Sequence, residues 1–185
     1  MPRITTLAAL IAAAALAAPT ARADDTKTGN AKAAPVNDRL FAEAAAAAGA
    51  AEIAASTIAL KNGGDDARKF AQNMIDDHSK ANTQLMTLAR AKGIALPTTM
   101  SYQDTAVGDI LGGLKGEEFD REYLKQQHAA HMCAVQLFTA EAERGQDADI
   151  RAFATKTLPT LKQHLKMAME ECEKCEKDDK SKSSK

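Results

Sequence analysis

Four histidines and one glutamate carry the groups in this chain best suited to metal chemistry. These candidate site residues are Glu52, His78, His128, His131 and His164. Imidazole nitrogens and carboxylate oxygens bind zinc, copper, nickel and iron, and helical bundles hold such ions with side chains from facing helices. The residue types therefore suit a transition-metal site, provided that the fold brings them together.

The positions of these residues follow the spacing of apolar stripes on helices. Apolar residues recur every three or four positions in four segments, as on the core-facing side of a bundle helix. A titratable residue interrupts each stripe near its middle; His78, for example, lies on the stripe of Met74 and Ala81. His128 lies one turn before His131 on the same face. We therefore expect these titratable side chains to face the core.

The heights of the candidate residues along their helices also agree. Glu52 lies 11 residues before the Gly63–Gly64 turn, and His78 lies 14 residues after it. At about 1.5 Å per residue, the two differ in height by roughly 4–5 Å. His131 and His164 are similarly placed about the turn between the last two segments. We therefore predict that Glu52, His78, His131 and His164 converge at one level.

Two interpretations of this convergence remain open. In one, the residues bind a transition-metal ion, which could be zinc, copper, nickel or iron. In the other, Glu52 and the histidines form a hydrogen-bonded network that fixes helix register. A di-iron oxidase is disfavoured because its Glu-x-x-His step is absent: Ile75 precedes His78 by three positions, and Leu161 precedes His164 by three. We assign no catalytic residue.

Four predicted helices must position these residues. They run over about 37–60, 65–93, 117–145 and 147–176, and a crossover at 98–116 has room for a short helix near 103–111. The second and fourth share an Arg-x-Phe-Ala opening, at Arg68 and Arg151. Low aromatic content argues against a β fold. The sequence therefore predicts an all-α, ferritin-like four-helix bundle, in which a long crossover joins two helical hairpins.

The N-terminus has the pattern of a cleaved export signal. Arg3 precedes an apolar run over 7–18, and Ala21-Arg22-Ala23 forms a small-x-small cleavage site. We expect a signal peptide at 1–23, a flexible leader at 24–35, the four-helix domain at 36–176 and a charged, disordered tail at 177–185. We expect no later segment to be long and apolar enough to span a membrane. The chain is therefore predicted to be periplasmic or in the cell envelope.

The overall charge argues against one class of partner. With 24 Lys+Arg against 25 Asp+Glu, the formal net charge is −1, so no basic excess is present to bind nucleic acid. The sequence suggests a metal ion as a partner, and it does not identify a protein partner for the alternative, an envelope structural or interaction module.

Several motifs in combination resemble a known family. They are Phe70-Ala71-x-x-Met74 with Asp77-His78, Phe119-Asp120-x-x-Tyr123 with His131, and Leu158-Pro159-x-Leu161-x-x-His164-Leu165. Over roughly 36–170 the chain resembles the exported bacterial proteins of domain-of-unknown-function family 4142. The resemblance implies a ferritin-like bundle in the periplasm or outer envelope and no established activity. It points to Glu52, His78, Asp120, Tyr123, His131 and His164. The aspartate that usually precedes the third-helix histidine is Ala130 here.

The three cysteines form an odd set for an oxidising compartment. Cys172 and Cys175 lie on the stripe of the last helix, and Cys133 is too far along the bundle to reach them. We expect Cys172 and Cys175 to pair with each other or bind a soft metal, and Cys133 to stay unpaired. The alternative is that all three are small packing residues, as buried cysteines often are.

Overall fold

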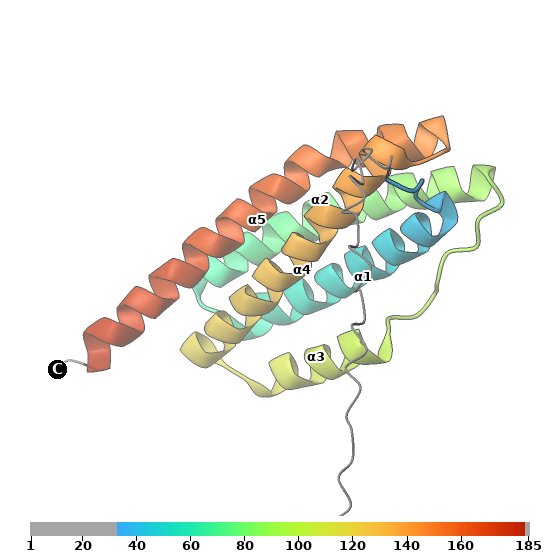
Figure 1. Cartoon of the computed structure of the whole chain (residues 1–185). Coiled ribbons are helices and arrows are strands. Elements are labelled where there is room, and N and C mark those ends of the chain that lie inside the picture. The colour runs from blue at the N-terminus through green and yellow to red at the C-terminus, as the bar shows by residue number, and fades with distance from the viewer. Residues whose placement is uncertain (1–32, 184–185) are drawn as a thin grey trace, which may run out of the picture. The chain divides into compact units, whose positions relative to one another are not determined.

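The computed structural model describes residues 33–183, which form five α-helices and no strand (Figure 1). The helices are α1 (Asp38–Asn62), α2 (Asp65–Ala91), α3 (Tyr102–Gly113), α4 (Gly116–Arg144) and α5 (Ala148–Ser183). The predicted all-α class is confirmed. The predicted signal peptide, 1–23, and the leader residues 24–32 lie outside the described residues.

The four long helices lie alongside one another (Figure 1). Helix α1 packs on α2 and α4, and α5 packs on α4 and α2. Short turns join α1 to α2 and α4 to α5, whereas the longer connection from α2 to α4 contains α3. Helix α3 contacts α1 and α4. It occupies the part of the crossover where the sequence left room for a short helix.

Each of the two short turns is held by a carboxylate from another helix. Gly64, at the start of α2, has no side chain to cap the helix, and its backbone N–H donates to Asp120 of α4 at 2.9 Å. At the other turn, Asp38 of α1 accepts from the backbone N–H groups of Gln146 at 2.7 Å and Asp147 at 3.0 Å. Both contacts satisfy N–H groups that a helix start or turn leaves without a partner.

The core contains two apolar clusters with polar residues between them along the helices. One cluster includes Phe70, Met74 and Tyr123, and the other includes Leu85 and Phe138. Burying each large apolar side chain contributes about 1.5–3 kcal/mol. The clusters therefore stabilise the helix packing, and they leave a layer of polar side chains between them.

Helix α5 extends beyond its expected end. We predicted an end near 176 and a disordered tail, but the helix continues to Ser183. Its last turns carry charged residues at helical spacing, among them Glu173 and Lys177, which form an i,i+4 ion pair at 3.5 Å. Such pairs and the high helix propensity of Glu and Lys stabilise a solvated helix. The tail prediction is corrected over 177–183.

Helix α1 is long and apolar enough, by length and composition alone, to cross a membrane; it is the one such helix in 33–183. This finding corrects the expectation that no segment after residue 23 meets that criterion. Its alanines raise its hydropathy, and it packs on α2, α3 and α4. A core helix packed on its neighbours meets the same criterion.

Candidate metal centre

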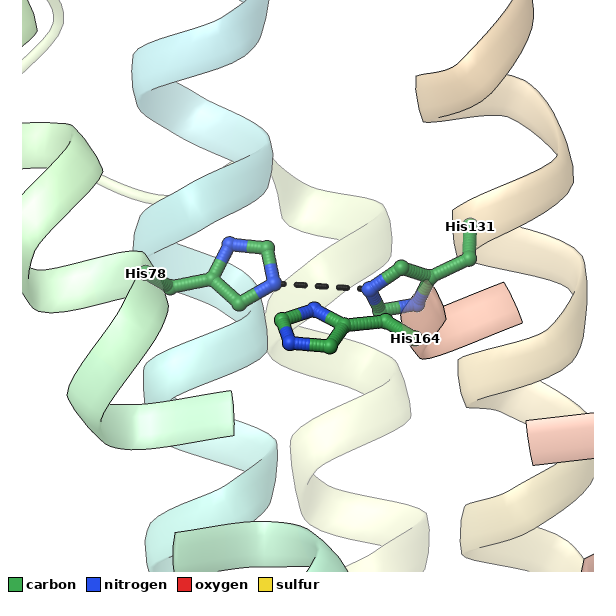
Figure 2. Close-up of side chains that lie close together, drawn as sticks. All are labelled: His78, His131 and His164. Carbon is green, nitrogen blue, oxygen red and sulfur yellow. Dashed lines mark hydrogen bonds between the residues drawn. The ribbon is translucent and has the colours of Figure 1, made fainter. Parts of the chain in front are cut away.

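Three buried imidazoles meet in the polar layer (Figure 2). His78 projects from α2, His131 from α4 and His164 from α5, and each is at most 7 % exposed. One nitrogen from each ring can be chosen so that all three lie within 4.8 Å of one another. The Nε2 atoms of His78 and His131 are 3.4 Å apart. Two nitrogens on a tetrahedral ion, with metal–nitrogen bonds of about 2.0–2.1 Å, would be about 3.3 Å apart.

The backbone of α4 sets the tautomer of His131. Its Nδ1 lies 2.9 Å from the carbonyl oxygen of Gln127, one turn earlier in the helix. Because a carbonyl can only accept, Nδ1 carries the proton and donates. The lone pair is then on Nε2, the nitrogen that faces His78. Metal-binding histidines usually donate their second ring N–H in this way, which fixes the orientation of the ring.

His164 is held in a similar way by a carboxylate of α2. Its Nε2 donates to Asp77 Oδ2 at 3.0 Å. The other ring nitrogen, Nδ1, is buried and has no hydrogen-bond partner among the described residues. A buried polar atom without a partner costs about 1–3 kcal/mol. The Nδ1 lone pair is therefore available to a ligand that the three imidazoles could hold.

The electrostatics of the cluster favour neutral imidazoles. Burial, followed by the nearby His131 and His164, lowers the pKa of His78 to about 3. Burial also lowers the pKa of His131 to about 4, and it lowers the pKa of His164 against the opposing effect of Asp77. Since the neutral ring is the form that binds a metal, these imidazoles are ready to coordinate at neutral pH without losing a proton.

Glu52 lies beside the cluster, at the opposite edge of His131 from Nε2. Its Oε1 is 3.8 Å from His131 Nδ1, and its Oε2 is buried without a hydrogen-bond partner. Burial raises the pKa of Glu52 to about 8, although a hydrogen bond with the Gln127 side chain lowers it. Glu52 is thus mainly protonated at neutral pH, and it adjoins one imidazole without pointing at all three.

Of the five candidate residues, three therefore come together and Glu52 adjoins them. His128 is half-buried and is not part of the group that could hold an ion. The other two positions that the family resemblance indicated also lie elsewhere. Asp120 accepts from Gly64 at the α1–α2 turn, and the buried hydroxyl of Tyr123 lies 2.9 Å from Ser56 Oγ. Both have structural contacts that account for them.

Two residues that orient the imidazoles escaped the sequence reasoning. Asp77 is adjacent to His78, and consecutive helix residues point about 100° apart, so the apolar stripe that carries His78 does not carry Asp77. That rotation directs its carboxylate toward α5, where His164 is within reach. Gln127 acts through its backbone carbonyl, which no residue type could have revealed. The adjacent Asp77-His78 pair was the feature of the sequence that could have indicated the role of Asp77.

The cysteines lie outside this centre. Cys172 and Cys175 are half-buried and pack beside the apolar cluster that includes Tyr123 and Ala168. Their pairing, or binding of a soft metal, stays a prediction. Cys133 is exposed on α4 and forms no disulfide with a described residue.

The fold and the site together define an all-helical protein with a buried cluster of three histidines. By its sequence, the chain belongs to the family described as "Domain of unknown function (DUF4142)", whose model matches residues 22–170. This agrees with the family resemblance seen in the motifs around Phe70, Phe119 and Leu158. No curated protein matches the chain.

Two solved structures share the fold. One is a DUF305 fragment from Deinococcus radiodurans, with 12% sequence identity and a TM-score of 0.66, covering 77% of this chain and 99% of that one. The other is a DUF305 protein from Streptomyces coelicolor, with 16% identity and a TM-score of 0.60, covering 71% of this chain and 87% of that one. At these identities, the similarity concerns the fold alone.

Proposed function

We propose that this protein binds one transition-metal ion between His78, His131 and His164, for sequestration, storage or stress tolerance and without turnover. The observation that carries the proposal is the buried Nδ1 of His164, which has no hydrogen-bond partner and belongs to a group of three convergent imidazoles. A bound cation would satisfy this nitrogen and use the lone pair of His131 Nε2.

The donor set favours a borderline metal ion. Neutral imidazole suits zinc, copper, nickel and iron, whereas calcium and magnesium prefer oxygen ligands. Two of the rings donate their second N–H groups, to the Gln127 carbonyl and to Asp77, as metal-binding histidines do. Because the rings are already held in place, metal binding costs less side-chain conformational entropy.

The proposal extends to the architecture and the compartment. We infer a ferritin-like four-helix bundle in which α1–α2 and α4–α5 are the two hairpins and α3 belongs to the crossover. The export pattern at residues 1–23 supports delivery to the periplasm or cell envelope. In agreement with export, the Streptomyces coelicolor relative carries the name "putative secreted protein DUF305".

A second candidate function is that of a structural or interaction module whose polar core fixes helix register. It is favoured by the hydrogen bonds that His131 and His164 make within the protein. The two candidate functions predict different effects of a chelator on thermal stability. A register-fixing network would give the same melting temperature with and without a chelator, whereas removal of a bound metal ion would lower it.

Metal titration with two histidine variants separates the candidates. The protein without residues 1–23 is stripped with a chelator and titrated with Zn²⁺, Co²⁺, Ni²⁺ and Cu²⁺, and bound metal is counted by mass spectrometry. His131→Ala removes a cluster imidazole, whereas His128→Ala removes a half-buried histidine outside the cluster and serves as the control.

We expect one ion per chain in the wild type and in His128→Ala, and affinity at least about 100-fold weaker in His131→Ala, since even residues behind the ligands contribute 10–100-fold. A saturating ion at 100 times its dissociation constant should add about 2.7 kcal/mol to the free energy of unfolding. Equal, sub-stoichiometric metal in all three proteins would refute the proposal.

A further inference from the structure

A pocket lies where α3 covers the bundle. Helix α3 packs on α1 and α4 (Figure 1), and a pocket of about 490 Å³ lies between the three helices. Small-molecule sites in proteins commonly have volumes of about 300–1,000 Å³. Alanines of α1 and α4, together with Ile58 and Val107, form the apolar part of its wall. The pocket is therefore large enough for an organic molecule with an apolar body.

Two buried polar side chains line this pocket with oxygens that have no partner. Gln127 is 2 % exposed and Glu52 is 7 % exposed, and neither Gln127 Oε1 nor Glu52 Oε2 has a hydrogen-bond partner among the described residues. An amide oxygen can only accept, so the group that Gln127 lacks is an N–H or O–H donor. The same donor can serve Glu52, because a carboxyl group keeps an acceptor oxygen in either protonation state. The two oxygens therefore favour a ligand that donates hydrogen bonds.

The charges of the lining indicate the charge of that ligand. Glu52 of α1 and Asp104 and Asp109 of α3 line the pocket, whereas no lysine or arginine does. Burial is the main cause of the raised pKa of Glu52, and the charge of Asp104 adds to it, so these carboxyl groups act on one another. A cation in the pocket would relieve this repulsion, and an anion would add to it. The other polar side chains of the lining carry no positive charge; they are Gln103, Thr105, Gln126 and Cys133.

The pocket is separate from the three-histidine cluster, because none of the three imidazoles lines it. His131 stands between the two: Glu52 Oε1 lies 3.8 Å from its Nδ1, whereas its Nε2 faces His78. A metal ion on the Nε2 side would repel a cation in the pocket without sharing a position with it. An inference about this pocket therefore goes beyond the proposed metal-binding function and does not depend on it.

We propose that the pocket binds a small organic cation, namely an alkylammonium with an apolar body. The ammonium group donates hydrogen bonds to Gln127 Oε1 and Glu52, and the apolar body packs on the alanines and Ile58 of α1. The carboxylates of Asp104 and Asp109 attract the positive charge from α3. Binding is non-covalent, and it gives two buried oxygens the partners that they lack.

The test compares three probes that share one body and differ in charge: phenylbutylammonium, phenylbutanol and phenylbutanoate. Each is titrated by calorimetry into the chain without residues 1–23, stripped of metal with a chelator so that no dication repels the ammonium. Cys133 reports where a probe binds, because it is exposed and lines the pocket. Its alkylation by iodoacetamide is followed by mass spectrometry of peptides, with Cys172 of α5, which is not in this lining, as the internal reference.

Two variants remove the proposed contacts. Gln127→Leu replaces the accepting amide with an apolar side chain of similar size. Asp104→Asn/Asp109→Asn removes the carboxylates of α3 at a half-buried and an exposed position, and it serves if Gln127→Leu does not fold. The matched control is Asp76→Asn/Glu118→Gln, which removes two exposed carboxylates outside the lining. Thermal unfolding of each protein detects a change in the fold separately.

We expect the ammonium probe to bind saturably, the alcohol to bind at least about tenfold more weakly, and the carboxylate not to saturate, because hydrogen bonds from a charged donor are the stronger ones. The bound ammonium should slow the alkylation of Cys133 and leave that of Cys172 unchanged. Its affinity should fall at least about tenfold in Gln127→Leu. It should fall about fivefold in Asp104→Asn/Asp109→Asn, which is the scale of one charge pair in water, and stay unchanged in the control.

Four results would overturn the inference. They are equal affinity for the ammonium and the alcohol, binding that leaves Cys133 unprotected, equal affinity of Asp104→Asn/Asp109→Asn and its control, and no saturable binding of the ammonium. None of these results depends on the metal titration, so the proposed function and this inference can fail independently.

Discussion

The hydrogen bond between Asp77 and His164 provides the sharpest test of how the site is organised. Asp77→Ala removes the only acceptor that the described residues provide for His164 Nε2, at 3.0 Å. The imidazole is 2 % exposed, whereas the Asp77 side chain is 48 % exposed. Loss of the carboxylate therefore leaves a buried donor whose orientation is no longer fixed, without removing a proposed metal ligand.

Two magnitudes follow from this geometry. Residues behind a metal ligand typically contribute 10–100-fold to affinity, which corresponds to roughly 1.4–2.7 kcal/mol. In the metal-free protein, a buried N–H without an acceptor costs about 1–3 kcal/mol. Asp77→Asn should lose less than about tenfold in affinity, because its amide oxygen can still accept and the charge of a half-exposed carboxylate is partly screened by solvent.

The assay is a Zn²⁺ competition titration against a chromophoric chelator, with chemical unfolding of the metal-free proteins in parallel. Asp76→Ala is the matched control, because Asp76 is exposed and adjacent in sequence, and its carboxylate accepts from the Gln72 side chain on its own helix at 2.9 Å. We expect the wild type and Asp76→Ala to bind Zn²⁺ equally and most tightly, Asp77→Asn to bind it less tightly, and Asp77→Ala to bind it least tightly. An Asp77→Ala protein with wild-type affinity would show that this carboxylate does not orient a ligand.

Three further substitutions probe other parts of the molecule. Burial, followed by nearby carboxylates, raises the pKa of Glu141 from 4.5 to about 7, so the stability it contributes is full below about pH 4.5 and is lost as the pH rises through about 7. Glu141→Gln should therefore increase the free energy of unfolding over the wild type by about 1–2 kcal/mol more at pH 8 than at pH 4.5, as measured by urea unfolding at both pH values. The same difference between variant and wild type at the two pH values would contradict this reasoning. Tyr123→Phe removes the partner of the buried Ser56 hydroxyl and should cost about 1–2 kcal/mol in the same assay, whereas a stability equal to the wild type would show that Ser56 finds another partner. Gly49→Ala should displace Asn82, because the new Cβ would come within 2.3 Å of its side chain, and lower the melting temperature; a higher melting temperature would show that the amide moves aside without loss.

The helices and the three convergent imidazoles were accessible from the sequence because both depend on periodicity. His78 and His131 interrupt apolar stripes, and a stripe must face the core to be buried. The role of Asp77 was not accessible in this way. Its contact with His164 depends on the rotation of α2 against α5, which is a property of the packed helices.

Glu52 illustrates a different limit. Counting residues along the helix placed it at the correct height, and the structure sets it 3.8 Å from His131. Height along an axis does not determine which edge of an imidazole a carboxyl group meets. The end of α5 was also beyond the sequence reasoning, since we treated charged residues at 177–183 as a sign of disorder, although their helical spacing allows ion pairs.

The two carboxylates that hold the short turns have a consequence for folding cooperativity. Asp38 belongs to α1 and holds the α4–α5 turn, whereas Asp120 belongs to α4 and holds the α1–α2 turn. Each hairpin thus supplies the residue that completes the turn of the other. An excised hairpin would lack that contact at its own turn, so the two halves are stabilised by docking and should unfold together in one transition.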